Sequence, residues 1–213
     1  MSDARVVLIG GTSNVGKSTV AQVVAERLGF AYRSTDALAR HPGRPWRKPG
    51  WEVPEHVAEH YRSLTVDELI SSVLDHYERL WPRIEELIAE HAAGPDGLVL
   101  EGSALWPTRV AALTVPRTAA VWLTAEDTVV RARVHKACDY ARASAEERHL
   151  VDKCLARSAR YQSLMRAELS GLGLATTHVV DSGDGRSVEE VADAVLLAVD
   201  AQDGGRRVTP RTP

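Results

Sequence analysis

The chain has 213 residues, 44% of them hydrophobic, and its 26 basic and 29 acidic side chains leave a formal net charge of −3 at pH 7. This length and composition suit one compact domain with a sizeable core, and the near-neutral charge argues against nucleic acid as a partner, since proteins that bind a phosphate backbone carry clustered basic charge. No apolar run approaches the ~18 residues of a membrane span and no signal-peptide layout follows the start, so we expect a cytoplasmic protein without a membrane partner.

Strand-like and helix-like segments alternate along the chain. Short, largely apolar runs predict strands over residues 5–10, 30–35, 97–102, 118–124 and 177–181. Helical periodicity and capping residues predict helices over residues 18–28, 36–40 and 65–88, one that starts at 124, and two more over 144–171 and 187–199. Pro82 is expected to kink or break the long helix that begins at Thr65.

This alternation predicts the fold class. Because parallel strands need long crossovers, which are usually helical, we expect an α/β protein, a three-layer sandwich around a mainly parallel sheet. No linker divides the chain, so we place one domain over residues 1–201 and a disordered tail over residues 202–213. Cys138 and Cys154 form no Cys-x-x-Cys pair and indicate neither a disulfide framework nor a zinc site.

The most specific motif lies between the first predicted strand and the first long helix. Residues 11–18 read Gly-Thr-Ser-Asn-Val-Gly-Lys-Ser and match G-x-x-x-x-G-K-[ST] at every fixed position. Glycines let successive N–H groups point inward and the helix N-terminus adds its positive dipole end, so a polyphosphate fits such a loop. We expect Lys17 on the β- and γ-phosphates and the Ser18 hydroxyl on Mg²⁺. The predicted nucleotide contacts are Gly11, Thr12, Ser13, Asn14, Val15, Gly16, Lys17, Ser18 and Thr19.

At this loop the sequence resembles the small P-loop kinases, a group that includes nucleoside monophosphate kinases, shikimate kinase, gluconate kinase and chloramphenicol phosphotransferase. Residues 9–19 also look like 2-phosphoglycerate kinases. The resemblance covers the layout of residues 5–199, and only the loop itself is specific. It implies a P-loop NTPase fold with five parallel strands in the order 2-3-1-4-5 and a helical lid over residues 135–149. It further implies ATP and Mg²⁺ as cofactors and a small-molecule acceptor whose hydroxyl receives the γ-phosphate.

Two carboxylates follow predicted strands and compete for one catalytic role. Asp36 comes directly after the second strand, where it could orient or deprotonate the acceptor hydroxyl; the alternative is a plain helix N-cap. Glu101 ends the third strand in the pattern Leu-Val-Leu-Glu-Gly, the position of a Walker B acid that reaches Mg²⁺. Its longer side chain could instead serve as the acceptor base, and a solvated strand end is the structural alternative.

Arginines supply the remaining candidates, because only four of the 26 basic residues are lysines. Arg131 and Arg133 lie on the helix after the fourth strand, where the kinase lid begins. They could stack on adenine or clamp the transferring phosphoryl group, and surface ion pairs are the alternative. Together with Lys17, Asp36 and Glu101, we count Arg131 among the predicted catalytic residues.

Acceptor contacts are predicted from two segments. Arg157, Arg160 and Tyr161 share one helical face and resemble the Arg-x-x-x-Tyr of shikimate kinases, in which the arginine holds the acceptor's carboxylate. Arg40 and Arg44 lie in the loop after Asp36, which also carries tryptophan and could shape the acceptor pocket. A structural ion pair and ordinary loop packing are the respective alternatives.

Two functions from different classes stay open on the sequence alone. The first is a kinase that transfers phosphate from ATP to an alcohol, with a Ser18 and Glu101 metal site. The second is a nucleotide-binding regulatory ATPase without a small-molecule acceptor, because a P-loop by itself establishes nucleotide binding only. The sequence holds no guanine-binding motif, which favours ATP, and a homodimer is left open.

Overall fold

The computed structural model describes residues 3–39, 43–47, 51–183 and 185–207. A five-stranded sheet forms its centre, with all neighbouring strands parallel and the order β2-β3-β1-β4-β5. The strands are β1 (Val6–Gly11), β2 (Ala31–Ser34), β3 (Leu98–Glu101), β4 (Thr118–Thr124) and β5 (Val179–Asp181). The predicted fold class and strand order are therefore confirmed.

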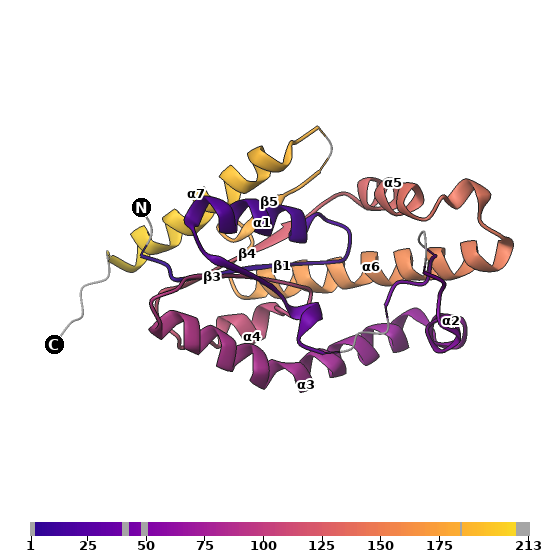
Figure 1. The fold of residues 1–213 in the computed structure, drawn as a ribbon, viewed down its shortest axis with the longest axis horizontal. Coiled ribbons are helices and arrows are strands. Elements are labelled where there is room, and N and C mark those ends of the chain that lie inside the picture. Colours follow the sequence, from indigo (N-terminus) through magenta and orange to yellow (C-terminus); the bar gives the residue numbers. More distant parts are fainter. Residues whose placement is uncertain (1–2, 40–42, 48–50, 184, 208–213) are drawn as a thin grey trace.

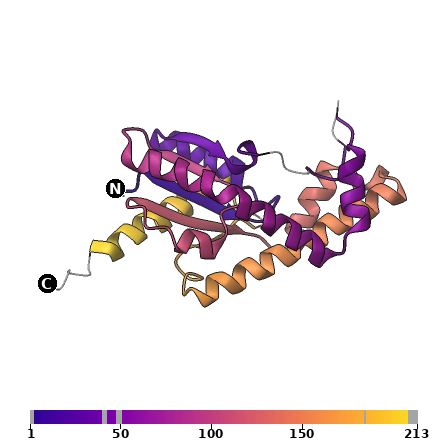
Figure 2. The same cartoon turned by 90° about the horizontal axis from the view of Figure 1, so that it is seen from below.

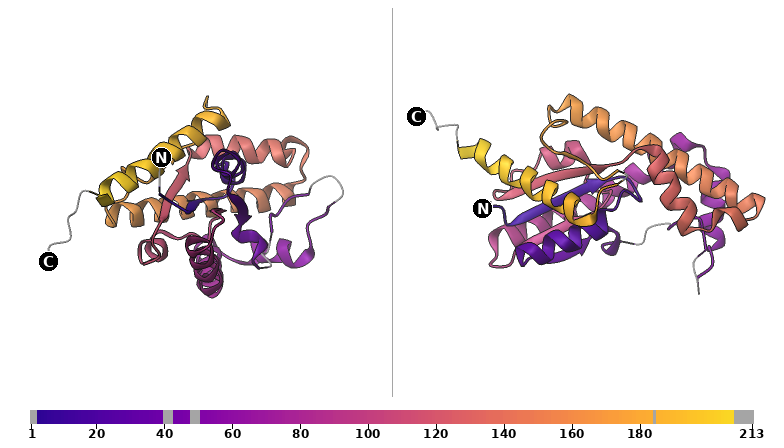
Figure 3. Two further views of the ribbon diagram at one scale, coloured as in Figure 1. Left: turned by 60° about the vertical axis from the view of Figure 1, so that its left-hand side comes forward. Right: turned by 90° about the horizontal axis from the view of Figure 1, so that it is seen from above.

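Helices cover both faces of the sheet (Figure 1). They are α1 (Lys17–Leu28), α2 (Glu55–Ser63), α3 (Val66–Ala93), α4 (Pro107–Ala111), α5 (Asp127–Ala137), α6 (Ala145–Gly171) and α7 (Val188–Arg207). Helices α1 and α7 pack on one face, the one in front in the right-hand view of Figure 3. Helices α3 and α4 and the second half of α6 pack on the other face, seen from below in Figure 2. Three layers result, as the alternation of strands and helices predicts.

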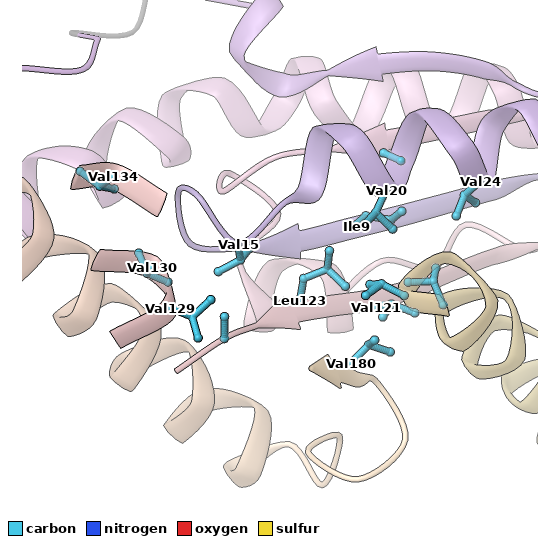
Figure 4. Packing of buried hydrophobic residues seen from close by; sticks show 14 of the residues in the cluster. Ile9, Val15, Val20, Val24, Val121, Leu123, Val129, Val130, Val134 and Val180 are labelled. Atoms are coloured by element: carbon cyan, nitrogen blue, oxygen red, sulfur yellow. The ribbon is translucent and has the colours of Figure 1, made fainter. Parts of the chain in front are cut away.

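The two faces of β1 explain why its sequence is apolar throughout. Successive side chains of a strand point to opposite faces, so Val7 and Ile9 join the α1 side while Val6 and Leu8 join the α3 side. All six residues of the strand are buried. Figure 4 shows Val20 of α1 packed near Ile9 on the α1 side. A strand buried on both faces anchors the start of the loop that follows it.

Capping boxes start the two longest helices. The Thr65 hydroxyl accepts a hydrogen bond from the Glu68 N–H, and the Glu68 carboxylate accepts one from the Thr65 N–H at 2.7 Å. Ser144 and Glu147 make the same pair of bonds at the start of α6. Each box satisfies two N–H groups that a helix start leaves without a partner.

The structure differs from several helix predictions. A 3-10 turn over Thr35–Ala37 stands where a helix over residues 36–40 is expected. Helix α3 runs through Pro82 without a break; the proline removes one backbone donor, and buried Trp81 and Ile84 on either side of it hold the helix on the core. Helix α7 extends to Arg207 and not to about 199. The side-chain amide of Gln202 accepts from the Ala120 N–H at 3.1 Å and donates to its carbonyl oxygen at 2.9 Å, so position 202 is tied to β4.

Helices α2 and α5 and the first half of α6 project beyond the carboxyl ends of the strands (Figure 1). The predicted lid, residues 135–149, comprises the end of α5, a 3-10 turn over Tyr140–Arg142 and the start of α6. Within the described ranges, no helix is both long and apolar enough to cross a bilayer. The carboxyl edge of a parallel sheet is where ligands bind in α/β proteins, and the projecting helices surround this edge.

Candidate active site

The P-loop joins β1 to α1 through a tight turn with three left-handed residues. The backbone φ angle is 134° at Gly11, 66° at Asn14 and 97° at Gly16, values that glycine adopts freely and asparagine tolerates. A Cβ at Gly11 would also lie 2.5 Å from the carbonyl oxygen of Leu123 in β4. The close approach of β4 therefore explains the first fixed glycine of the motif, and the left-handed backbone explains the second.

Hydrogen bonds from neighbouring loops hold the P-loop in this shape. The Ser182 hydroxyl, after β5, donates to the Val15 carbonyl at 2.6 Å, and the Val15 side chain is fully buried (Figure 4). The Arg133 guanidinium of α5 donates to the Ser182 carbonyl at 2.7 Å and to the Asn14 carbonyl at 3.4 Å. Arg133 thus bridges the P-loop and the loop after β5.

Lys17 is a buried cation with two carboxylates near it. Its ammonium group donates to the Thr12 carbonyl at 2.7 Å, and only 8% of the residue is exposed. Burial lowers the pKa of Lys17 below its ordinary value, Glu101 and Asp36 oppose this shift, and Arg44 adds to it. The lysine therefore lies where negative charge from a ligand would compensate its desolvation.

Glu101 is joined to the P-loop helix and to the neighbouring strand. Its Oε1 accepts a 3.0 Å hydrogen bond from the Ser18 hydroxyl and a 3.1 Å hydrogen bond from the Tyr32 hydroxyl. Burial raises the pKa of Tyr32, and the Glu101 charge raises it further, so the tyrosine stays protonated and able to donate. The parallel register pairs Glu101 with Ser34, so Tyr32, two residues before Ser34, points to the same face of the sheet as Glu101.

Asp36 is placed by a close contact between two strand ends. A Cβ at Gly102, whose φ is 155°, would overlap the Thr35 side chain, so only glycine lets the 3-10 turn over Thr35–Ala37 lie against the end of β3. The Ser34 hydroxyl caps this turn by accepting from the Asp36 N–H at 3.3 Å. The cap is Ser34, which leaves the Asp36 carboxylate exposed and free for another role.

One cavity of about 720 Å³ collects most of these groups. The predicted site residues that line it are Ser13, Asn14, Gly16, Lys17, Ser18, Thr19, Asp36, Arg44, Glu101, Arg133 and Arg157. They come from the P-loop, the ends of β2 and β3, the loop before α2, and helices α5 and α6. Both predicted carboxylates and four predicted cations therefore face one space.

Six predicted residues that the structure describes do not line this cavity, and three of them lie outside the P-loop. Arg131 is exposed on α5 and borders a separate hollow of about 120 Å³. Arg160 forms an exposed ion pair with Asp67, 3.5 Å between Nε and Oδ1, so the structural alternative applies. The Tyr161 hydroxyl donates to the Ser103 carbonyl at 2.5 Å, and its ring is buried in the core. Helical spacing groups Arg160 and Tyr161 with Arg157 on α6, but only Arg157 of the three lines the cavity.

Three P-loop positions and one arginine complete the account of the predicted residues. Gly11 and Val15 are buried behind the P-loop and contribute backbone, not a cavity wall. The Thr12 hydroxyl donates to the Ser158 carbonyl at 3.1 Å and so ties the loop to α6. Arg40 lies outside the described residues.

The cavity also holds residues that the sequence motifs do not single out. Tyr77 of α3, Trp51 before α2, Ser103 after β3 and Cys154 of α6 all line it. Ser103 could have been found from the motif, since it follows Glu101 by two positions; its hydroxyl donates to the Gly11 carbonyl at 2.8 Å. The others come from helices and loops with no recurring spacing.

Comparison with known proteins supports the fold. No protein-family description and no curated protein matches the sequence. The structure is similar to a gluconokinase from Sinorhizobium meliloti, with 19% identity, coverage of 97% of this chain and 98% of that chain, and a TM-score of 0.59. It is also similar to the shikimate kinase from Aquifex aeolicus, with 15% identity, coverage of 92% and 97%, and a TM-score of 0.51. The chain has the fold of the P-loop small-molecule kinases.

Proposed function

We propose that the protein transfers the γ-phosphate of ATP to a hydroxyl group of a small-molecule acceptor. One observation carries this proposal: the P-loop lysine, Lys17, lines a single cavity with two strand-end carboxylates, Asp36 and Glu101. Phosphoryl transfer needs a phosphate cradle, a metal site and a group that positions the attacking oxygen, and these residues offer all three. The similarity to kinase structures agrees with this chemistry.

The nucleotide would occupy the P-loop side of the cavity. Lys17 and the inward N–H groups would hold the β- and γ-phosphates, with the N-terminus of α1 adding its dipole. Arg133 lines the same cavity and already contacts the Asn14 carbonyl, whereas Arg131 does not line it. We therefore assign the charge-stabilising role at the transferred phosphoryl group to Arg133 in place of Arg131.

The residues at the α1 start fit a magnesium ion. The Ser18 hydroxyl and a Glu101 carboxylate oxygen lie 3.0 Å apart, and Mg²⁺ takes oxygen ligands, few of them from protein. No cluster of three His, Cys, Asp or Glu side chains occurs among the described residues, so a denser metal cage is not offered there. Bound Mg²⁺ would neutralise charge on the phosphates; Ser18 and Glu101 would hold it.

Asp36 is the better candidate for the group that accepts the acceptor proton. In the described part of the chain its carboxylate has no side-chain hydrogen bond or ion pair, and it is exposed to the cavity. Glu101 is 3% exposed, and its Oε1 already accepts two hydrogen bonds. A carboxylate with free lone pairs can accept a proton from a bound hydroxyl, so we place Asp36 at the acceptor and Glu101 at the metal.

A turnover experiment tests the proposal. ATP consumption by the purified protein is expected to be slow alone and strongly stimulated by a correct acceptor, with the phosphorylated product detected by mass spectrometry. Lys17→Ala should abolish both rates. Failure of every alcohol in a broad panel, together with a partner protein that changes nucleotide affinity, would support the regulatory ATPase instead.

A further inference from the structure

Thr12 connects the P-loop lysine to helix α6. Its carbonyl oxygen accepts a 2.7 Å hydrogen bond from the Lys17 ammonium group, and its hydroxyl donates a 3.1 Å hydrogen bond to the Ser158 carbonyl of α6. Thr12 is 3% exposed and is not among the described residues that line the cavity. The Thr12 side chain is therefore buried in protein, and any effect that it has on a nucleotide would pass through another residue.

Two carboxylates compete with the Thr12 carbonyl for the lysine. Burial lowers the pKa of Lys17, and the charges of Glu101 and Asp36 oppose this shift, so both carboxylates act on the ammonium group. Among the described residues, however, no carboxylate oxygen lies within 4.0 Å of that group. The hydrogen bond goes to the neutral carbonyl of Thr12 instead.

This choice of partner matters for a phosphate ligand. An ammonium group has three donors, so one hydrogen bond to a neutral carbonyl directs it and leaves donors for phosphate oxygens. An ion pair with either carboxylate would instead neutralise the charge that the phosphates need. The position of the Thr12 carbonyl therefore decides whether Lys17 is available to a nucleotide.

The turn of α6 that accepts the threonine hydroxyl is itself attached to two strand ends. The Tyr161 hydroxyl donates to the Ser103 carbonyl, after β3, at 2.5 Å. The Gln162 side-chain amide donates to the Ala125 carbonyl, after β4, at 2.8 Å and accepts from the Ala125 N–H at 3.2 Å. Tyr161 and Gln162 are both buried. The turn is therefore held by β3 and β4, and a hydrogen bond to it restrains the P-loop residue that makes the bond.

We propose that Thr12 is a positioning residue for Lys17: its hydroxyl bond to α6 holds the Thr12 carbonyl where it keeps the ammonium group at the phosphate site and away from the two carboxylates. Because side-chain rotamers depend on the backbone angles of the same residue, a fixed hydroxyl restrains the carbonyl beside it. This assignment rests on the nucleotide placement of the proposed function. It requires that the Thr12 hydroxyl affect nucleotide binding only while Lys17 is present.

A thermodynamic cycle measures this dependence. Calorimetry on the full chain gives the Kd for a non-hydrolysable ATP analogue with Mg²⁺ in the wild-type protein, Thr12→Val, Lys17→Ala and the double variant. Valine keeps the branched shape of threonine without its hydroxyl. Thr12→Val should weaken binding about fivefold, the net effect of one hydrogen bond. In the Lys17→Ala background the same substitution should change Kd by less than about twofold, because the group that Thr12 positions is gone.

Two further variants separate positioning from a general effect on the fold. Thr12→Ser keeps the hydroxyl and should restore Kd to within about twofold of the wild-type value. Ser158→Ala is the matched control: it removes a buried hydroxyl that donates to the Cys154 carbonyl at 2.9 Å in the same turn, and it keeps the Ser158 carbonyl that Thr12 uses. It should leave Kd unchanged. Thermal unfolding checks that each variant folds, and Thr12→Ala takes the place of Thr12→Val in the cycle if the valine variant does not.

The outcomes distinguish this inference from the proposed function. An equal effect of Thr12→Val with and without Lys17 overturns the positioning role, as does an unchanged Kd in the single variant or an equal loss in Ser158→Ala. If an acceptor is phosphorylated but the two substitutions are additive, the phosphotransferase function stands and the inference fails. If the substitutions are coupled but no alcohol is phosphorylated, the inference stands and the phosphotransferase function fails. Absence of binding of the analogue by the wild-type protein rejects both.

Discussion

The Ser18 hydroxyl donates a 3.0 Å hydrogen bond to Glu101 Oε1, which joins the first turn of α1 to the last residue of β3. These two residues are 83 positions apart in sequence. The parallel pairing of β1 with β3 brings the P-loop and the Glu101 strand end to one edge of the sheet. The pair is therefore a consequence of the strand order, and in the proposed function it supplies oxygen ligands to the metal bound to ATP.

Glu101→Gln should reduce phosphate transfer by on the order of 100-fold, because an amide keeps the shape of the side chain but lacks the charge that a metal ligand supplies. The Mg²⁺ concentration for half-maximal rate should rise, while the affinity for ATP without metal should change little. Initial rates across a Mg²⁺ titration measure both. An unchanged Mg²⁺ requirement would remove Glu101 from the metal site.

Tyr32→Phe tests whether a neighbouring hydroxyl positions that carboxylate. Loss of the 3.1 Å hydrogen bond to Glu101 should raise the Mg²⁺ requirement about tenfold, the lower end of what outer-shell substitutions cost, with a smaller effect on saturated turnover. Tyr140→Phe is the control, since it also removes a hydrogen bond from a tyrosine to a carboxylate, Asp152, away from the cavity. A similar Mg²⁺ response in both variants would indicate a general effect on stability.

Asp36→Asn should lower transfer to the acceptor and leave ATP binding in place. Asn keeps the 3-10 turn, whose cap is Ser34, but cannot take up the acceptor proton, and general-base loss costs on the order of 100-fold or more. Single-turnover transfer and separate calorimetry with a non-hydrolysable ATP analogue measure the two effects. Equal transfer by the wild-type protein and the variant would return the base role to Glu101, the alternative that the sequence leaves open.

The sequence predicts the frame of the site better than its walls. The P-loop, the buried strands and Glu101 follow from local patterns, because a glycine turn, a buried strand and a strand-end acid each carry their own residue signature. The strand order follows from the resemblance to the small P-loop kinases. Arg131, Arg133, Arg157 and Arg160 share no such signature. Which of these arginines reaches the cavity depends on helix rotation and packing, so only the structure separates Arg133 and Arg157 from the other two.

Acid sensitivity is expected from the helix caps. The backbone N–H of Thr65 holds the pKa of Glu68 below its usual range, and the Ser144 and Ser187 N–H groups do the same for Glu147 and Glu190. A carboxyl whose pKa is lower in the folded than in the unfolded state stabilises the fold at pH values above its ordinary pKa of 4.5. That contribution is lost as the pH falls below this value.

The thermal midpoint should therefore drop between about pH 5 and pH 3, and the drop should be smaller in Glu68→Gln, which starts from a lower midpoint at pH 7 because it has lost the charged cap. Calorimetric scans at several pH values measure both. Glu86→Gln is the control: this glutamate is on the same helix α3, away from its start, and pairs only with exposed Arg83 at 3.5 Å among the described residues. An equal pH response in both variants would contradict the capping assignment.

Gly102→Ala should disturb the placement of Asp36 through Thr35. The new Cβ would overlap the Thr35 side chain at a backbone φ of 155°, and such strain costs about 1–3 kcal/mol, so the free energy of unfolding should fall by roughly that amount. Thr35→Ala removes the hydroxyl and methyl groups that the new Cβ meets. Among the described residues this substitution breaks no hydrogen bond, since the Thr35 Oγ1 is buried without a partner there. The double variant should therefore be more stable than Gly102→Ala alone, and it should recover part of the transfer rate. Denaturant unfolding of the two single variants and the double variant gives the coupling energy between these residues. Additive effects would show that Gly102 is needed for its backbone angle alone and not for the contact that carries Asp36 to the cavity.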